Sequence, residues 1–221
     1  MNSYVFDVFI IAILFALFGL SHSFLASLWV KKMLLSLLGS KMAFYRITYN
    51  IFSLISLFVI YQLSPKPSLK IYDLPNPFDL IILIPQFAGI AGFLWTLKFF
   101  DTKEFLGLNQ IYRYFNDQYN SEELDERLTL RIEGPYRYSR HPVYLFSIMI
   151  LIFRPVMDLF YLTILLCIIT YFYIGSYFEE KKLREVFGEK YRNYQEKVPR
   201  IFPVRFYSPY IKPAENSSAA D

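Results

Sequence analysis

A short segment rich in basic and aromatic residues is the first feature of the chain that could do chemistry. Residues 134–142 read Gly-Pro-Tyr-Arg-Tyr-Ser-Arg-His-Pro and directly precede an apolar stretch. Pro142 suits the first turn of a helix, where no backbone N–H donor is needed. Arg137, Arg140 and His141 thus gather at a helix start, which favours anions. They predict either a site for a carboxylate or phosphate, or an anchor at lipid headgroups.

Two adjacent carboxylates, Glu179 and Glu180, stand at the other end of that apolar stretch. Negative charge at the C-terminal end of a helix opposes the helix dipole, so these side chains need partners. They can pair with nearby Arg and Lys side chains and be structural, or they can bind a cation or an amine. Because a helical hairpin brings its two ends together, we expect Arg140 and His141 to line one site with the glutamates.

The elements that position these residues are those of a membrane protein. Of the 221 residues, 55% are apolar and only 19% are charged, which excludes a disordered chain and a nucleic-acid binder driven by charge. Cys167 is the only cysteine and there are two histidines, so neither a disulfide framework nor a metal site is expected. Four regions are apolar enough to span a bilayer, at residues of about 4–30, 44–63, 80–100 and 143–178.

The last of these regions is too long for one span. Arg154 and Pro155 interrupt it, and proline ends or kinks a helix because it lacks an N–H donor. We therefore expect an all-α polytopic membrane protein with about five transmembrane helices, the last two forming a helical hairpin. We also expect residues 1–212 to form a single domain and the small polar residues 213–221 to form a disordered tail.

The basic residues predict how the chain crosses the membrane. Of its 23 Lys and Arg, 20 lie in residues 31–46, in residues 98–141 or after residue 178. By the positive-inside rule, the N-terminus is outside and the C-terminus is cytoplasmic, which places the candidate site on the cytoplasmic side. We expect an integral membrane protein, of the inner membrane in a bacterium, whose basic segments contact membrane lipids and not nucleic acid. We do not expect the first span to be a cleavable signal peptide, since no Lys or Arg precedes it.

Two motifs in the C-terminal half resemble those of membrane methyltransferases, the superfamily of isoprenylcysteine carboxyl methyltransferases and phospholipid N-methyltransferases. The resemblance covers about residues 133–203. Its motifs are Gly134-Pro-Tyr-x-x-x-Arg-His-Pro-x-Tyr144 and Glu179-Glu180-x-x-Leu183-x-x-x-Phe187-Gly188-x-x-Tyr191-x-x-Tyr194-x-x-x-Val198-Pro199-Arg200.

This resemblance implies a cytoplasmic site for S-adenosylmethionine, the methyl donor. It implies that Glu179 and Glu180 hold the amine of the cofactor, that Arg140 serves catalysis by shaping the pocket, and that further contacts come from Tyr136, His141 and Tyr144. Tyr144 would pack against the cofactor. Methyl transfer is a direct displacement, so positioning and exclusion of water supply much of the rate.

Shorter motifs in the N-terminal half resemble a narrower branch, the NnrU-type proteins and the methanethiol S-methyltransferases. They favour a thiol such as methanethiol as the acceptor, with isoprenylcysteine carboxylate and lipid amines left open. They are Ser21-His22-Ser23-x-x-Ala26-Ser27, Tyr45-Arg46-x-x-Tyr49-Asn50 and Phe105-x-Gly107-Leu108-x-Gln110.

Two polar residues of these N-terminal motifs fall inside expected spans. An ionisable residue inside a span is a functional candidate, so His22 is predicted to be a base or an acceptor-positioning group. The alternative for His22 is a hydrogen bond between helices, and for Asn50 packing between helices is favoured over chemistry.

One position departs from the methyltransferase pattern. Phe146 stands where the family commonly has glycine, a residue that allows close approach of a ligand or helix. It predicts a narrower site, a different acceptor or a divergent member. Two other functions remain open: a non-catalytic NnrU-like membrane protein, and an NADPH-dependent reductase of the sterol type on a related fold.

Overall fold

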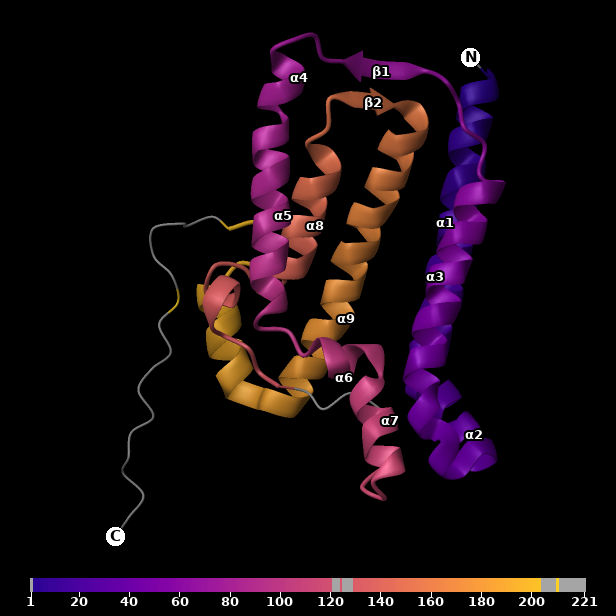
Figure 1. Cartoon of the computed structure of the whole chain (residues 1–221), viewed down its shortest axis with the longest axis vertical. Helices are drawn as coiled ribbons and strands as arrows, with labels where there is room; N and C mark the ends of the chain where they lie inside the picture. Colours follow the sequence, from indigo (N-terminus) through magenta and orange to yellow (C-terminus); the bar gives the residue numbers. More distant parts are fainter. Residues whose placement is uncertain (1, 121–123, 125–128, 204–209, 211–221) are drawn as a thin grey trace.

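The computed structural model describes residues 2–120, 124, 129–203 and 210, so the tail expected at residues 213–221 lies outside the described part. Long helices run side by side along one axis (Figure 1). In chain order the elements are α1 (Asn2–Ala26), α2 (Leu28–Leu38), the 3-10 helix η1 (Gly39–Phe44), α3 (Tyr45–Leu63), β1 (Lys70–Asp73), α4 (Phe78–Ile81), α5 (Leu83–Leu97), α6 (Thr102–Leu106), α7 (Leu108–Phe115), the 3-10 helix η2 (Gly134–Arg137), α8 (Pro142–Ile152), β2 (Val156–Asp158) and α9 (Leu159–Lys197).

The described helices confirm an all-α membrane protein. Four helical stretches within the described residues are long and apolar enough to cross a bilayer: Ser3–Ala26, Leu28–Leu63, Phe78–Leu97 and Leu159–Lys197. The fifth expected helix, α8, has 11 residues. Its length is about 17 Å against a hydrocarbon core of about 30 Å. The expected hairpin of the last two helices is present, with a short first arm.

The turn of this hairpin is pinned to the loop after α3. β2 pairs antiparallel with β1, and the partners are Lys70 with Asp158, Tyr72 with Met157 and Asp73 with Val156. The guanidinium of Arg154 lies 3.8 Å from the centre of the Tyr161 ring. Arg154 and the sheet therefore mark one end of the molecule, and the start of α8 faces the other (Figure 1).

Helix α8 packs closely on α5 because glycines open the surface of α5. A Cβ built on Gly92 would lie 2.2 Å from Cε1 of Phe146, and one on Gly89 would lie 3.0 Å from Cβ of Met149. The Phe146 ring thus fills the space above Gly92. Phe146 faces the neighbouring helix, and it is not among the residues that line the polar pocket described below.

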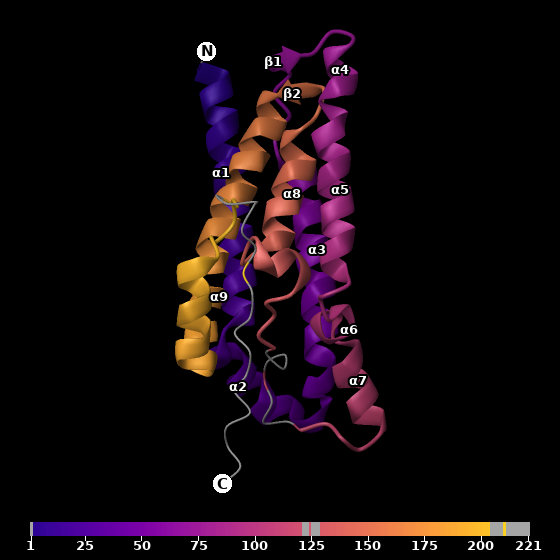
Figure 2. The same cartoon turned by 90° about the vertical axis from the view of Figure 1, so that its left-hand side faces the viewer.

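Helix α9 continues well beyond the apolar stretch that ends at Phe178. Its last part turns back beneath α8 (Figures 1 and 2). The bend lies at Gly188, whose φ of 53° and ψ of −131° are not helical and which is unrestrained by a side chain. Beyond the bend, Tyr191 and Tyr194 pack with Ile132 and Val198 in a buried cluster. This returning segment brings the end of the chain to the Arg-His motif.

Candidate functional site

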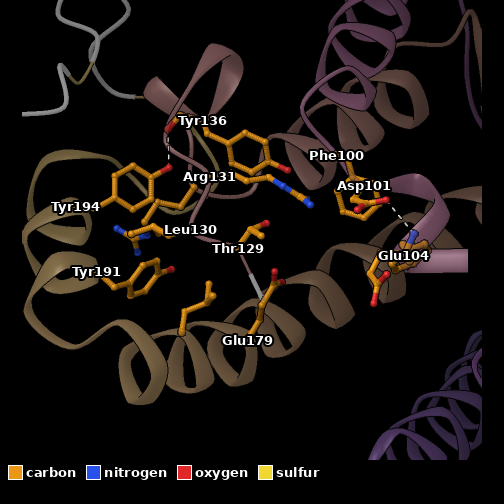
Figure 3. Close-up of a pocket in the computed structure, with 13 residues that line it drawn as sticks. Phe100, Asp101, Glu104, Thr129, Leu130, Arg131, Tyr136, Glu179, Tyr191 and Tyr194 are labelled. Atoms are coloured by element: carbon orange, nitrogen blue, oxygen red, sulfur yellow. Dashed lines mark hydrogen bonds between the residues drawn. The ribbon is translucent and has the colours of Figure 1, made fainter. Parts of the chain in front are cut away.

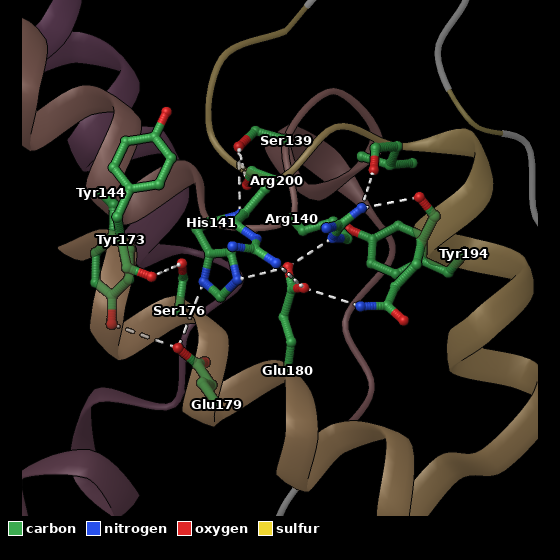
Figure 4. Close-up of polar contacts among 12 residues, drawn as sticks. Ser139, Arg140, His141, Tyr144, Tyr173, Ser176, Glu179, Glu180, Tyr194 and Arg200 are labelled. Atoms are coloured by element: carbon green, nitrogen blue, oxygen red, sulfur yellow. Dashed lines mark hydrogen bonds and ion pairs between the residues drawn. The ribbon is translucent and has the colours of Figure 1, made fainter.

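Glu180 lies at the centre of the polar side chains near the start of α8 (Figure 4). Its side chain is 1% exposed, and one carboxylate oxygen accepts hydrogen bonds from Arg140 Nε at 2.8 Å and His141 Nε2 at 3.1 Å. The other oxygen accepts from Gln195 Nε2 at 2.9 Å and lies 3.3 Å from Arg200 Nη2. Four donors from two segments, residues 140–141 and 195–200, therefore surround one buried carboxylate.

Backbone hydrogen bonds hold the Arg-His motif against the returning segment. The N–H of Arg140 donates to the carbonyl of Pro199 at 3.0 Å, and that of His141 donates to the carbonyl of Arg200 at 2.9 Å. The guanidinium of Arg140 also donates to the carbonyl of Gln195 at 2.8 Å. The two ends of the hairpin meet as the sequence predicted, and the bend in α9 adds a third segment to them.

The charges in this cluster stabilise one another. Burial alone would raise the pKa of Glu180, but hydrogen bonds from His141 and Arg140 together with their charges lower that pKa to about 2. Burial alone would lower the pKa of His141, but hydrogen bonds to Glu179 and Glu180 raise it above 6.5. Glu180 is therefore ionised, and His141 is held toward its protonated form.

Glu179 differs from Glu180 in its exposure. Its side chain is 50% exposed, and its carboxylate lies 3.4 Å from both His141 Nδ1 and the Tyr144 hydroxyl. The rings of His141 and Tyr144 are parallel at 5.2 Å, and Phe172 stacks on Tyr144 at 4.4 Å. One oxygen of the Glu179 carboxylate therefore lies against the stacked rings, and the exposed part of the carboxylate can contact a ligand.

A polar pocket lies on the exposed side of Glu179 (Figure 3). It encloses about 120 Å³ and carries side chains of both charges next to aromatic rings. Its wall comes from the turn between α5 and α6, the segment before η2, η2 itself and both parts of α9. The lining residues are Phe100, Asp101, Glu104, Phe105, Thr129, Leu130, Arg131, Tyr136, Arg140, Glu179, Leu183, Tyr191 and Tyr194.

Two of the three N-terminal motifs, those with Asn50 and Phe105, meet at the far rim of this pocket. Glu104 is buried, and both of its carboxylate oxygens accept hydrogen bonds from Arg113, at 2.9 and 3.0 Å. The carbonyl of Phe105 accepts from Arg46 Nε and Asn50 Nδ2, each at 3.0 Å. Asn50 therefore ties α3 to α6, in agreement with the packing role favoured for it.

His22 lies in a separate network between α1 and α3. Its Nδ1 is 2.8 Å from the Ser53 hydroxyl, and its Nε2 is 2.6 Å from the Tyr49 hydroxyl. Because Ser53 Oγ donates to the carbonyl of Tyr49, Nδ1 is assigned the proton, and Nε2 accepts from Tyr49. The ring of Tyr171, on α9, lies 6.0 Å from the His22 ring. Both ring nitrogens of His22 are thus engaged by protein groups.

Comparison with known proteins gives a consistent set of relatives. The chain is 28% identical over 193 residues to a methanethiol S-methyltransferase of Crocosphaera subtropica, covering 86% of this chain and 72% of that protein. It is 29% identical over 202 residues to methanethiol S-methyltransferase 1 of Bradyrhizobium diazoefficiens, covering 87% of this chain and 66% of that protein. It is 28% identical over 192 residues to a methanethiol S-methyltransferase of Pseudomonas deceptionensis, covering 86% and 71%.

The chain is a homologue of the methanethiol S-methyltransferases. This finding confirms the resemblance to the isoprenylcysteine carboxyl methyltransferase-like branch that the motifs predict. The matched regions cover about two thirds to three quarters of these three relatives. No protein-family model matches the chain, and no solved structure matches it.

The predicted site residues of this methyltransferase homologue fall into three places. Tyr136, Arg140 and Glu179 line the polar pocket. His141, Tyr144 and Glu180 lie directly behind them and contact Arg140 or Glu179. His22 is in the α1–α3 network and does not line the pocket.

Sequence reasoning missed part of the pocket wall. Tyr191 was visible as a residue of the second motif but was not singled out as a site residue. Arg131, which follows a region rich in charged residues, carried no signal that set it apart from them. Within the described residues, no group of three or more His, Cys, Asp or Glu could hold a metal ion.

Proposed function

We propose that this chain is a membrane methyltransferase that transfers the methyl group of S-adenosylmethionine to a small thiol such as methanethiol. The names of its relatives support the reaction class and the thiol. The observation that carries the donor is Glu179, a half-exposed carboxylate in a pocket of mixed charge and aromatic rings. S-adenosylmethionine has a cationic sulfonium, an ammonium and a carboxylate next to an aromatic base, and this pocket offers a counterpart to each.

The residues of the pocket divide the proposed ligand between them. Glu179 would pair with the ammonium, and Arg131 would take the carboxylate in a charge-assisted hydrogen bond. The apolar wall around Leu130 and Tyr194 would receive the base. The cavity of about 120 Å³ is smaller than the roughly 300 Å³ typical of ligand pockets, so side chains must shift on binding.

Glu180 has a different proposed role from Glu179, although the sequence treats them as a pair. With four protein donors around it, its carboxylate has little capacity for a ligand ammonium. We infer that Glu180 is a positioning residue that holds Arg140 at the pocket wall and His141 behind Glu179. Tyr144 would act in the same way through its hydroxyl, because both faces of its ring are covered by His141 and Phe172.

When bound, S-adenosylmethionine would supply an electrophilic methyl group to the acceptor sulfur and leave as S-adenosylhomocysteine, and the proton of the thiol would pass to a base. The thiolate is the nucleophile, so this proton must be lost. His22 is retained as the base or the acceptor-positioning group. To act as a base, its Nε2 must lose the hydrogen bond from Tyr49; the ring of Tyr171 on α9 lies 6.0 Å from the His22 ring.

Transfer of a labelled methyl group by the purified full chain tests this proposal. Methanethiol should give dimethyl sulfide. Isoprenylcysteine and lipid amine acceptors belong in the same assay, because an apolar hollow of about 780 Å³ lined by Phe146, Trp95 and Phe202 could receive a lipophilic acceptor. If only a lipophilic acceptor gives product, the assignment of a thiol as the acceptor is overturned. If no acceptor gives product, the non-catalytic alternative is favoured.

The variant Glu179→Gln tests the donor site directly. It should weaken binding of S-adenosylhomocysteine by about 10- to 100-fold, because a charge-assisted hydrogen bond becomes a neutral one. Glu189→Gln is the matched control: it lies on the same helix, 75% exposed and paired with Arg192, and should bind like the wild type. Binding by Glu179→Gln equal to that of the control would refute the role of Glu179.

A further inference from the structure

The hydroxyl of Tyr191 is a buried polar group that has no hydrogen-bond partner in the part of the chain that the structure describes. Tyr191 is 1% exposed, and within the described residues its hydroxyl oxygen makes no hydrogen bond. Nearby side chains on the same segment are satisfied: the Tyr194 hydroxyl donates to the carbonyl of Tyr136, and Gln195 donates to Glu180. Buried polar groups are nearly always paired because an unmet hydrogen bond costs free energy. An exception in a pocket wall therefore points to a ligand.

The direction of the side chain supports this interpretation. Tyr191 lies on the part of α9 that returns after the bend at Gly188, and its ring is fixed in the cluster with Ile132 and Val198. Its hydroxyl end points into the pocket, on the side where Glu179 and Thr129 face it (Figure 3). Because the ring is fixed, the hydroxyl can donate a hydrogen bond only toward the interior of the pocket.

The surroundings of the hydroxyl indicate which ligand atoms it meets. Leu130 and Tyr194 lie beside Tyr191 in the pocket wall (Figure 3), and the charged Arg140 and Glu179 line the same pocket and act on the Tyr191 hydroxyl electrostatically. Apolar and aromatic surface next to a fixed hydroxyl donor suits a flat heteroaromatic ring that has nitrogen acceptors on its edge.

We propose that the Tyr191 hydroxyl donates a hydrogen bond to a ring nitrogen of the adenine base of the bound donor. This inference rests on the proposed function and adds a base-recognition residue to it. The oxygen has less than 1 Å² of exposed surface, so the ligand reaches it when neighbouring side chains shift. Tyr191 is then a specificity residue that distinguishes adenine from bases without an acceptor at that position.

The variant Tyr191→Phe separates this role from a structural one. It should weaken binding of S-adenosylhomocysteine by about 5- to 30-fold, because a ring nitrogen of the ligand loses its donor. Its melting temperature without ligand should be equal to that of the wild type or higher, since the removed hydroxyl has no partner. The control Tyr161→Phe removes a hydroxyl that donates to the carbonyl of Leu151 at 3.0 Å at the other end of α9. It should lower the melting temperature and leave binding unchanged.

Two further ligands locate the contact. 5′-Methylthioadenosine lacks the amino-acid half, so Tyr191→Phe should weaken its binding by the same factor. Loss for S-adenosylhomocysteine alone would place the contact on the amino-acid half and overturn the assignment to adenine. The wild-type chain should bind one of the 1-deaza, 3-deaza and 7-deaza analogues of S-adenosylhomocysteine more weakly than S-adenosylhomocysteine itself. The variant Tyr191→Phe should bind that analogue and S-adenosylhomocysteine equally well. This wild-type comparison decides the point even if the variant fails to fold.

The outcomes also separate this inference from the proposed function. If the wild type binds S-adenosylhomocysteine and Tyr191→Phe binds it equally well, the inference fails and the proposed function stands. If the wild type binds neither S-adenosylhomocysteine nor 5′-methylthioadenosine, the proposed function fails, and the inference fails with it.

Discussion

At the scale of single residues, the site separates two neighbouring carboxylates by their surroundings. Glu180 is enclosed by four donors, and Glu179 has one side against His141 and Tyr144 and the other toward the pocket. In the proposed function, the same residue type, one position apart on a helix, would have a positioning task at Glu180 and a binding task at Glu179. His141 links them, because its two ring nitrogens face the two carboxylates at 3.1 and 3.4 Å.

The charge on His141 should be visible in the pH dependence of stability. Its pKa in the folded chain is raised above 6.5, so its contribution is fully present below pH 6.5 and is lost as the pH rises through the raised value. The difference in melting temperature between the wild type and His141→Gln should therefore be largest below pH 6.5. This difference should become smaller as the pH rises above 6.5. Thermal unfolding in detergent over pH 6 to 10 measures this.

The control for that titration is His22→Gln, which changes the other histidine of the chain. A gap between wild type and His141→Gln that stays constant, or that widens with rising pH, would contradict the ion pairs of His141. On the acid side, Glu180 has a lowered pKa of about 2, so its contribution is lost only as the pH falls from 4.5 toward that value.

At the scale of helices, the packing of α5 on α8 positions the start of the Arg-His motif. This interface depends on the absence of a side chain at Gly92, where the Phe146 ring lies. Phe146 therefore has a packing role against α5, and it also lines the apolar hollow. Filling the space from either side should tilt α8 and shift Arg140 at its start.

The variant Gly92→Ala should destabilise the chain by about 1–3 kcal/mol, because its Cβ would overlap the Phe146 ring. When Phe146 is already replaced by Ala, the additional substitution Gly92→Ala should lower the free energy of unfolding by less than it does in the wild type. Chemical unfolding in detergent measures both. Gly175→Ala is the control, since its nearest neighbour, the Tyr144 hydroxyl, would be 3.9 Å away. Additive effects of the two substitutions would show that they do not meet.

The sequence predicts these elements better than it predicts their contacts. The span at residues 44–63 coincides with α3, because hydropathy is a local property. The first span ends earlier than expected, since Ser27 caps α2 and accepts a hydrogen bond from the N–H of Val30. The return of α9 after Gly188 has no hydropathy signal, and with it come Tyr191 and the donors to Glu180 from Gln195 and Arg200. The motif was visible in the sequence, whereas its contacts depend on that bend.

At the scale of the whole molecule, the basic segments gather at one end. α2, α6, α7 and the end of α9 lie at the lower end in Figure 1, and the N-terminus, β1 and β2 lie at the upper end. Three segments far apart in sequence thus share a side, as the positive-inside rule requires of cytoplasmic segments. The polar pocket opens at the same end, so the assigned side of the membrane decides from which compartment the donor must come.

This sidedness can be measured with single-cysteine variants, because replacing Cys167 by Ala removes the only cysteine. Ser68 and Gln118 are exposed and lie near opposite ends of the molecule, beside β1 and after α7. In intact cells a membrane-impermeant maleimide should label Ser68→Cys, and it should label Gln118→Cys only after permeabilisation. The reverse pattern would place the pocket outside the cell. S-adenosylmethionine would then have to be supplied there, and the cytoplasmic-donor mechanism would be untenable.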